Sequence, residues 1–266
     1  MAANIIEITD RCDPRVAPFI GIRERDLTGG DDGRFIVEGK VPLSILLTRS
    51  RFEIDSLFLC ETRLGPLESI LNQVPASVPI YVAPQSLMDE IAGFPIHRGV
   101  LACARKGATS DLPTRLTSQR ILVLNQLSNH DNVGAAFRNA AAFGVDGVLL
   151  DSQSCDPLYR KAIRVSSGAS LWLPFHHRGT GQEHIDLLKA NGFTVWAMTP
   201  RADAAPLKGK GIPDKLAILL GAEGPGLADA LIAAAEPVRI PMSSGYDSIN
   251  VATAGAIALA HVFSGE

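Results

Sequence analysis

Three short segments of the chain combine glycines with polar side chains, and each directly follows an apolar run that predicts a strand. They are 125–138 (NQLSNHDNVGAAFR), 219–227 (LLGAEGPGL) and 240–251 (IPMSSGYDSINV). In open α/β sheets, ligands bind in the loops that follow the carboxyl ends of the strands. We therefore take these segments as the candidate ligand-binding loops.

The first segment places an asparagine and an arginine on a predicted helix. Asp131 or Asn132 can cap a helix that begins near Val133. At 3.6 residues per turn, Arg138 projects away from the apolar face of that helix. It is then free to meet solvent, a phosphate or another chain. A capped helix with a surface arginine explains the same residues without any site.

The second segment is a glycine-rich loop that carries a single acid, Glu223. Its glycines, Gly221, Gly224 and Gly226, permit positive φ and let a ligand approach the backbone closely. The Gly-x-x-Gly-x-Gly spacing is not the Gly-x-Gly-x-x-Gly fingerprint of dinucleotide-binding proteins. This argues against a nucleotide-dependent oxidoreductase. A tight strand-to-helix turn remains an alternative to a ligand loop.

In the third segment, Ser248 and Asn250 precede a predicted Ala-rich helix over 251–263. Either side chain could be the N-cap of that helix. Capping alone is thus one reading of these polar residues, and a role in a site is the other.

Taken together, and in this order, the three segments resemble the motifs of the SpoU (TrmH-like) family of RNA ribose methyltransferases, within the SPOUT superfamily. The resemblance rests on Asn132-x-Gly134-x-x-x-Arg138, on Gly221-Ala222-Glu223-Gly224-x-Gly226-Leu227, and on Ile240-Pro241-Met242 with Ser248-x-Asn250. The sequence departs from the family where His130 replaces a usual proline and where Gly245 comes one residue late. Upstream, 35–40 and 97–102 resemble the two ends of a substrate-binding domain with an L30e-like fold.

The resemblance implies an enzyme that uses S-adenosyl-L-methionine to methylate a ribose 2′-hydroxyl of rRNA or tRNA. The residues that it implies for catalysis are Arg138, Asn132, Glu223, Ser248 and Asn250. Those that it implies for the cofactor are Thr199, Gly221, Gly224, Ile240, Met242 and Ile249. The family is dimeric, and Arg138 is expected to serve the partner's pocket. A non-catalytic RNA-binding protein that retains the fold is the alternative.

The role of Arg138 follows from its chemistry. The guanidinium of arginine is a permanent cation in proteins. A guanidinium therefore suits a phosphate clamp or the stabilisation of a developing alkoxide better than proton abstraction. Glu223 is the other candidate base, or it orients Arg138.

Alternating apolar runs and helical patterns predict an α/β protein in two parts. We expect an N-terminal extension at 1–33, a small L30e-like α/β domain at 34–106, a linker at 107–119 and a SPOUT catalytic domain at 120–266. The strands expected in the catalytic domain are 121–124, 147–150, 171–174, 194–198 and 216–220. The helices expected there are 133–143, 159–165, 182–190, 227–235 and 251–263. The spacing predicts a parallel sheet covered on both faces, and the resemblance adds a C-terminal trefoil knot.

Composition limits how RNA could be bound. The chain has 25 Lys and Arg against 28 Asp and Glu, a formal net charge of −3, which excludes coating of nucleic acid through bulk positive charge. Any RNA contact must be local. On the predicted helix, Arg160, Lys161 and Arg164 either form a solvated face or contact the RNA backbone. His97 and Arg98 either touch RNA or close the first domain.

The cysteines predict neither a metal site nor a disulfide framework, because no two of them are close in sequence. They are Cys12, Cys60, Cys103 and Cys155. The most apolar helical stretch, 251–263, is shorter than the ~20 residues that span a bilayer. The N-terminus has no long apolar run typical of a signal peptide. We expect a cytoplasmic protein without a membrane segment.

Overall fold

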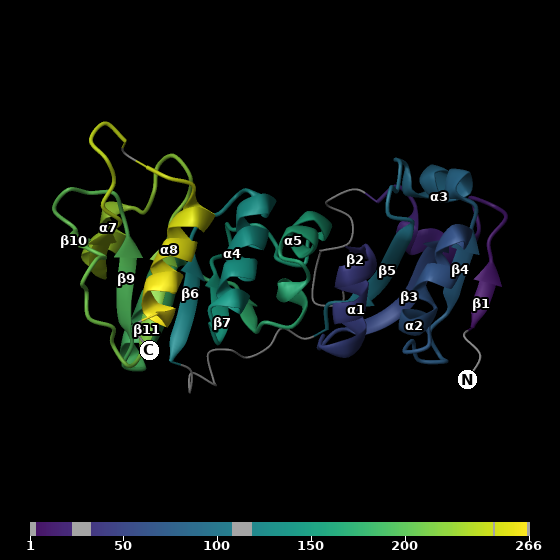
Figure 1. Ribbon diagram of the computed structural model, residues 1–266, viewed down its shortest axis with the longest axis horizontal. Coiled ribbons are helices and arrows are strands. Elements are labelled where there is room, and N and C mark those ends of the chain that lie inside the picture. The colour runs from purple at the N-terminus through teal and green to yellow at the C-terminus, as the bar shows by residue number, and fades with distance from the viewer. Residues whose placement is uncertain (1–3, 23–32, 108–118, 247, 265–266) are drawn as a thin grey trace. The chain divides into compact units, whose positions relative to one another are not determined.

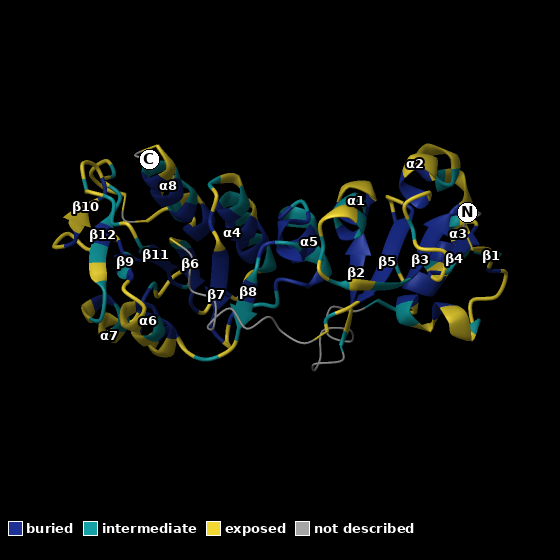
Figure 2. Ribbon diagram, turned by 90° about the horizontal axis from the view of Figure 1, so that it is seen from below, coloured by how far each residue is buried: buried dark blue, intermediate teal, exposed yellow. Residues whose placement is uncertain are grey.

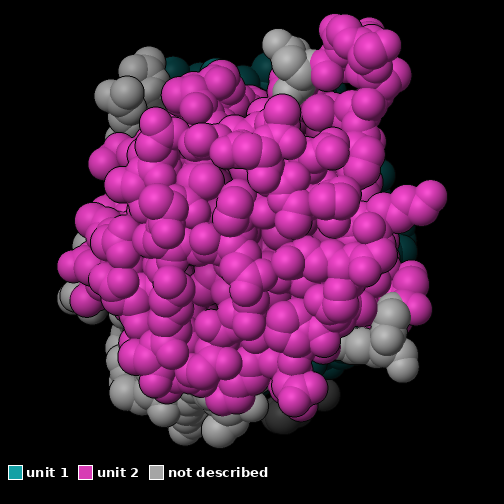
Figure 3. All heavy atoms as spheres, turned by 90° about the vertical axis from the view of Figure 1, so that its left-hand side faces the viewer, with its two compact units in different colours: residues 1–109, 158–172 teal, residues 110–157, 173–266 magenta. Residues whose placement is uncertain are grey.

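The computed structural model describes residues 4–22, 33–107, 119–246 and 248–264 (Figure 1). They fold as two compact units, coloured separately in Figure 3. Unit 1 is Met1–Thr109 together with Leu158–Trp172, and unit 2 is Ser110–Pro157 together with Leu173–Glu266. The second stretch of unit 1 was expected in the catalytic domain, so the units are not simply consecutive. Nearly all of the predicted linker, 107–119, lies outside the described residues.

Unit 1 is built on a five-stranded mixed sheet in the order β1-β4-β3-β5-β2. The strands are β1 (Ile5–Glu7), β2 (Arg34–Glu38), β3 (Glu53–Cys60), β4 (Ile80–Ala83) and β5 (Val100–Arg105). The helices are α1 (Lys40–Thr48), α2 (Glu68–Leu71), α3 (Gln85–Ala92) and α5 (Arg160–Val165). Strand β5 is antiparallel to both of its neighbours, and β1, β4 and β3 are mutually parallel. Helices α1 and α5 both pack against β2.

The sheet of unit 1 begins well before Arg34, where the sequence suggested that the domain starts. Strand β1 pairs with β4 at the sheet edge. The 3-10 turn Pro14–Phe19 buries Val16 and Phe19 in one apolar cluster with Met88 of α3. Part of the expected N-terminal extension is therefore built into the core of this unit.

Unit 2 is a seven-stranded, fully parallel sheet in the order β10-β12-β9-β11-β6-β7-β8. The strands are β6 (Arg120–Leu124), β7 (Gly147–Leu150), β8 (Phe175–His177), β9 (Thr194–Met198), β10 (Ala205–Pro206), β11 (Leu216–Leu220) and β12 (Glu236–Arg239). The helices are α4 (His130–Ala142), α6 (Gly181–Ala190), α7 (Asp229–Ala233) and α8 (Val251–Phe263).

Helices cover both faces of this sheet, as the apolar strands require. Helices α4 and α8 lie on one face, and α6 and α7 lie on the other (Figure 2). Every residue of β11 is buried, which is typical of a central strand in a covered parallel sheet. The predicted parallel α/β architecture of this half is therefore confirmed. No helix among the described residues is both long and apolar enough to cross a bilayer.

Two local predictions for this half were wrong. Residues 171–174 are not a strand: a 3-10 turn covers Ala169–Leu171, and β8 begins only at Phe175. Leu171 and Leu173 are buried without joining a sheet, and a short apolar run cannot distinguish these outcomes. Helix α4 is capped by neither Asp131 nor Asn132. Its N-cap is Asn129, whose side chain accepts a hydrogen bond from the Asp131 backbone N–H.

Candidate active site

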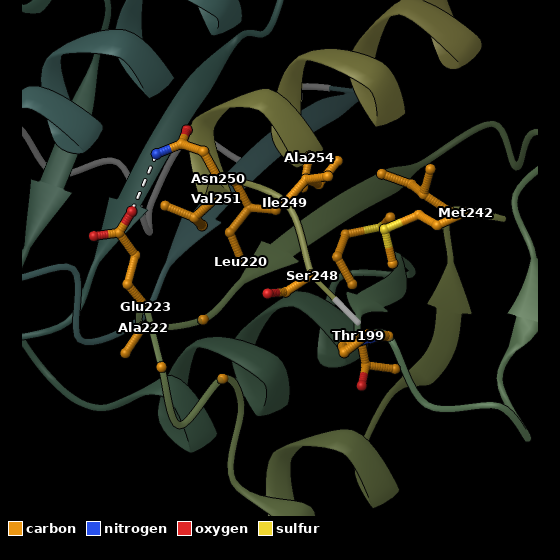
Figure 4. Close-up of a pocket in the computed structure, with 16 residues that line it drawn as sticks. Thr199, Leu220, Ala222, Glu223, Met242, Ser248, Ile249, Asn250, Val251 and Ala254 are labelled. Atoms are coloured by element: carbon orange, nitrogen blue, oxygen red, sulfur yellow. Dashed lines mark hydrogen bonds between the residues drawn. The ribbon is translucent and has the colours of Figure 1, made fainter. Parts of the chain in front are cut away.

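A pocket of about 370 Å³ lies at the carboxyl ends of three neighbouring strands of unit 2 (Figure 4). Strand β9 leads into Thr199, β11 into Gly221 and β12 into Ile240. These strands are adjacent in the order β12-β9-β11, and parallel strands bring their carboxyl ends to the same edge. The sheet order thus gathers residues that are far apart in sequence, and the volume is in the range of small-molecule sites.

All six residues expected to contact the cofactor line this pocket. They are Thr199, Gly221, Gly224, Ile240, Met242 and Ile249. Glu223, Ser248 and Asn250 line it as well. The lining is mainly apolar, with backbone amides and carbonyls of two loops interspersed. That combination suits a flat, heteroatom-rich ring whose faces are apolar and whose edges are polar.

The loop after β11 is shaped by glycine at Gly221. A Cβ built there would lie 2.7 Å from the carbonyl carbon of Gly226 and from the backbone nitrogen of Leu227. Real Cβ atoms do not approach backbone so closely, so only glycine fits without a shift of the loop. The Gly226 N–H donates to the carbonyl of Ala222 at 3.1 Å, which closes the loop into a tight turn beside the pocket.

Asn250 joins the three predicted loops at one end of the pocket. Its Nδ2 donates to Oδ1 of Asn132 at 2.9 Å and to Oε1 of Glu223 at 3.1 Å, the latter drawn in Figure 4. Its Oδ1 accepts from the backbone N–H groups of Ala252 at 3.0 Å and Thr253 at 3.1 Å. Asn250 is therefore the N-cap of α8 and also the link between the loops.

Asn132 is held in place by the packing of α4 against α8. It lies in the first turn of α4 and is buried. Asn139, two turns further on, donates to the carbonyl of Ala252 at 2.9 Å. A Cβ at Gly255 of α8 would lie 2.7 Å from Leu220, so this helix packs closely on β11. These contacts fix where Asn250 meets Asn132.

Arg138 is not brought to the pocket of its own chain. It follows Asn132 by six residues on α4, and its side chain is exposed, as the helical periodicity predicted. Among the residues that the structure describes, its guanidinium forms no hydrogen bond or ion pair. The structure thus groups Asn132, Glu223, Ser248 and Asn250 but leaves Arg138 pointing elsewhere.

Several lining residues were not predicted. They are Met198, Pro200, Leu220, Ala222, Gly226, Val251 and Ala254. Ala254 lies one helical turn after the N-cap Asn250, so helical spacing could have found it. Leu220 and Pro200 adjoin predicted residues, but their apolar side chains carry no chemical signal of their own.

The fold and this pocket define a parallel α/β protein with a small-molecule site at its strand ends and a carboxylate, Glu223, at the mouth. Within the described ranges, no group of His, Cys, Asp or Glu is arranged to hold a metal ion. The class is an α/β protein with a pocket of small-molecule size at the strand ends of its parallel sheet.

Comparison with known proteins specifies the family. The SpoU rRNA Methylase family model matches residues 119–260, which include all three loops. An uncharacterized tRNA/rRNA methyltransferase of Mycobacterium tuberculosis is 38% identical over 265 residues, covering 96% of this chain and 90% of that protein. The chain belongs to the SpoU rRNA methylase family, a family of methyltransferases, and the family resemblance of the three motifs is confirmed.

Solved structures agree with this fold over nearly the whole chain. The AdoMet-bound rRNA methyltransferase from Sinorhizobium meliloti superposes with a TM-score of 0.80 at 20% identity, covering 98% of each chain. A crystal structure of an RNA 2′-O ribose methyltransferase superposes with a TM-score of 0.78 at 24% identity, covering 98% of this chain and 99% of that one.

Proposed function

We propose that this protein transfers a methyl group from S-adenosyl-L-methionine to a ribose 2′-hydroxyl of rRNA or tRNA. The observation that carries the proposal is the meeting of three distant loops at one pocket, tied together by Asn250. Family membership supports methyl transfer to RNA. The AdoMet-bound neighbour supports the cofactor, and the 2′-O ribose methyltransferase neighbour supports the acceptor hydroxyl.

The pocket fits this cofactor in size and in chemistry. Apolar side chains of Ile240, Met242 and Ile249 suit the faces of the adenine ring, and the backbone of Gly221 and Gly224 suits polar groups. Glycine at position 221 lets the loop fold tightly on itself beside the pocket, with Gly226 and Leu227 close to Gly221. When bound, the cofactor supplies an electrophilic methyl on its sulfonium.

The chain's own residues then position and activate the acceptor. Glu223 is exposed at the pocket mouth and is oriented by the Nδ2 of Asn250, so its carboxylate is suited to accept the proton of the ribose hydroxyl. Ser248 lines the same edge and is suited to hold the ribose. Arg138 acts as a phosphate clamp and stabilises the developing alkoxide, because its guanidinium stays protonated.

The proposal requires a homodimer in which Arg138 of one chain serves the pocket of the other. Its exposed position, away from its own pocket, supports this arrangement. We further propose that the C-terminal segment forms a trefoil knot, which the match of residues 119–260 to the family supports. Unit 1 is proposed as an L30e-like RNA-binding domain, and the protein is proposed to act in the cytoplasm, where its RNA substrates are.

The function can be tested through Arg138. We expect Arg138→Ala to lower methyl transfer to RNA by about 100-fold or more, while calorimetry shows little change in cofactor affinity. The exposed Lys189→Ala on α6 is the control and should behave as wild type. The substrate is found by deleting the gene and mapping which 2′-O-methyl marks are lost. Unchanged transfer in Arg138→Ala, or equal loss of transfer and cofactor binding, would contradict the assigned role.

A further inference from the structure

Positively charged side chains gather at one end of the sheet of unit 1, around the turn from β2 to α1. We call this group the β2–α1 cluster: Lys40, Arg63, Arg98, Arg160 and Arg164. Arg98 lies across the turn, since a Cβ at Gly39 would be 3.0 Å from its Cδ and Nη1. Arg63 lies across Gly99 in the same way, with its Cγ and Nε 3.1 Å from such an atom. Two glycines thus let two arginines lie flat against the backbone.

Helix α5 carries the remaining two cations, Arg160 and Arg164, and both lie near one buried acid. Glu38, at the end of β2, is 6% exposed and forms an ion pair with Arg160. The same carboxylate lies 4.0 Å from Nη1 of Arg164. The guanidinium of Arg160 also stacks over the ring of Phe94 at 4.7 Å. The one buried acid therefore neutralises Arg160 and leaves Arg164, whose side chain is 38% exposed, only partly compensated.

Three members of the cluster, Lys40, Arg63 and Arg98, differ from several other arginines of this unit because they have no acid partner among the described residues. Elsewhere Arg11 pairs with Glu90, and Arg34 and Arg105 share Asp55. In the described part of the chain, Lys40, Arg63 and Arg98 form no ion pair.

Glu61 is the acid nearest to Arg63 in the sequence. Glu61 is exposed and pairs with none of these cations. Within the described ranges, Lys40, Arg63 and Arg98 therefore carry positive charge without an acid partner in a chain whose total charge is −3. The excess is local, as RNA binding by this chain requires.

Arginine side chains that are fixed by packing and have no acid partner are suited to bind phosphate groups. A guanidinium offers paired N–H donors that match two phosphate oxygens, and a fixed stem lowers the entropy lost on binding. The buried Nε of Arg63 has no hydrogen-bond acceptor, so its orientation is set by packing, which leaves the outer nitrogens for a ligand.

We propose that Lys40, Arg63, Arg98 and Arg164 bind consecutive phosphates of the RNA backbone, on a surface that α5 completes. The inference rests on the proposed function, because it takes RNA as the substrate. Helix α5 lies within the sequence matched by the methyltransferase family, at 119–260, yet it packs on unit 1. The proposed RNA-binding surface therefore combines residues from the first hundred positions with residues from the part of the chain that matches the family.

The salt dependence of RNA binding tests this surface. Each phosphate contact contributes about 0.7 to 0.9 to the slope of log affinity against log salt concentration. With labelled bulk bacterial tRNA as the probe, we expect the triple variant Lys40→Gln/Arg63→Gln/Arg98→Gln to reduce that slope by about 2 to 3. Cofactor affinity should remain as in wild type, because these residues lie outside unit 2. An unchanged circular dichroism spectrum checks that unit 1 stays folded.

A matched control separates a local surface from bulk charge. The triple variant Arg11→Gln/Arg15→Gln/Arg34→Gln removes the same charge from ion-paired positions of the same unit. It should keep the wild-type slope within about one contact. Equal loss of slope in both triples, or no loss in the first, would overturn the proposal. Methyl transfer by the wild-type enzyme is measured separately, so failure of the proposed function would show there and not in the slopes.

Discussion

The amide oxygen and the amide nitrogen of the Asn250 side chain have different roles. The oxygen caps α8, and the nitrogen holds Asn132 and Glu223. The short side chain of asparagine ends in a carboxamide, which supplies two N–H donors and one carbonyl acceptor. Serine or aspartate could cap the helix equally well, but neither carries the two N–H donors.

Substitutions at Asn250 can separate these two roles. Asn250→Asp keeps the capping oxygen but loses both donors and sets a second carboxylate against Glu223. We expect its stability to stay within about 0.5 kcal/mol of wild type, by the capping preference, and methyl transfer to fall on the order of 100-fold through misplacement. Asn250→Ala should in addition lose about 1 kcal/mol of stability.

Urea denaturation and single-turnover methylation measure the two effects. If Asn250→Asp methylates at the wild-type rate, the link to Glu223 has no part in the chemistry.

The residues of the site were predictable, but their contacts were not. Glycines and polar residues after apolar runs pointed to Gly221, Glu223 and Asn250 without any structure. That Asn250 meets Asn132 depends on the order of strands in the sheet, and hydrophobic periodicity does not encode that order. The cap of α4 was misplaced because Asn129, Asp131 and Asn132 are all good capping residues within four positions.

Among the elements, α5 has the least expected position, since it is packed on a sheet to which its neighbours in sequence do not belong. Its contact with β2 centres on the pair of Arg160 and Glu38, whose side chains are 19% and 7% exposed. Removing one partner from a buried ion pair leaves an uncompensated charge, which costs more than removing both.

We therefore expect Arg160→Met to destabilise the protein by about 3 kcal/mol. The double variant Arg160→Met/Glu38→Met should recover most of that loss, because no buried charge is then left alone. Chemical denaturation of the two single variants and the double variant forms the test cycle. Additive losses in the double variant would show that the two side chains do not interact.

Most elements followed from the sequence, and the strands that it missed were either too short or too polar to be recognised. Strands 147–150, 194–198 and 216–220 match the structure at both ends, because each is a compact apolar run between turn residues. The short β1 and β10 have too few residues to show a period. Strand β12 (Glu236–Arg239) contains Pro237 and two charged residues, so its composition predicts a loop.

On the scale of the whole molecule, the chain passes between its two units three times, after Thr109, after Pro157 and after Trp172. If one linker joined the two units, each unit could be expressed alone as a continuous segment of the chain. Here the fold of unit 1 requires a segment that the second half of the sequence supplies.

A cut in the predicted linker tests this connection. A specific protease site inserted after Thr109 should give two fragments that stay together in native size-exclusion chromatography, because Leu158–Trp172 remains part of unit 1. They should separate in denaturant. Adding Arg160→Met should promote their separation under milder conditions. Fragments that separate at once without denaturant would show that this segment does not hold unit 1.

The pairing of Glu38 with Arg160 also bears on how such proteins can recombine. The two positions are 122 residues apart. If the first hundred residues of one relative were fused to the remainder of another, Glu38 and Arg160 would come from different parents. A hybrid that takes its beginning from one parent and its remainder from another must inherit matching residues at both. We expect a hybrid to fold when its parents have the same residues at these two positions. It should also fold when α5 is exchanged together with the first hundred residues.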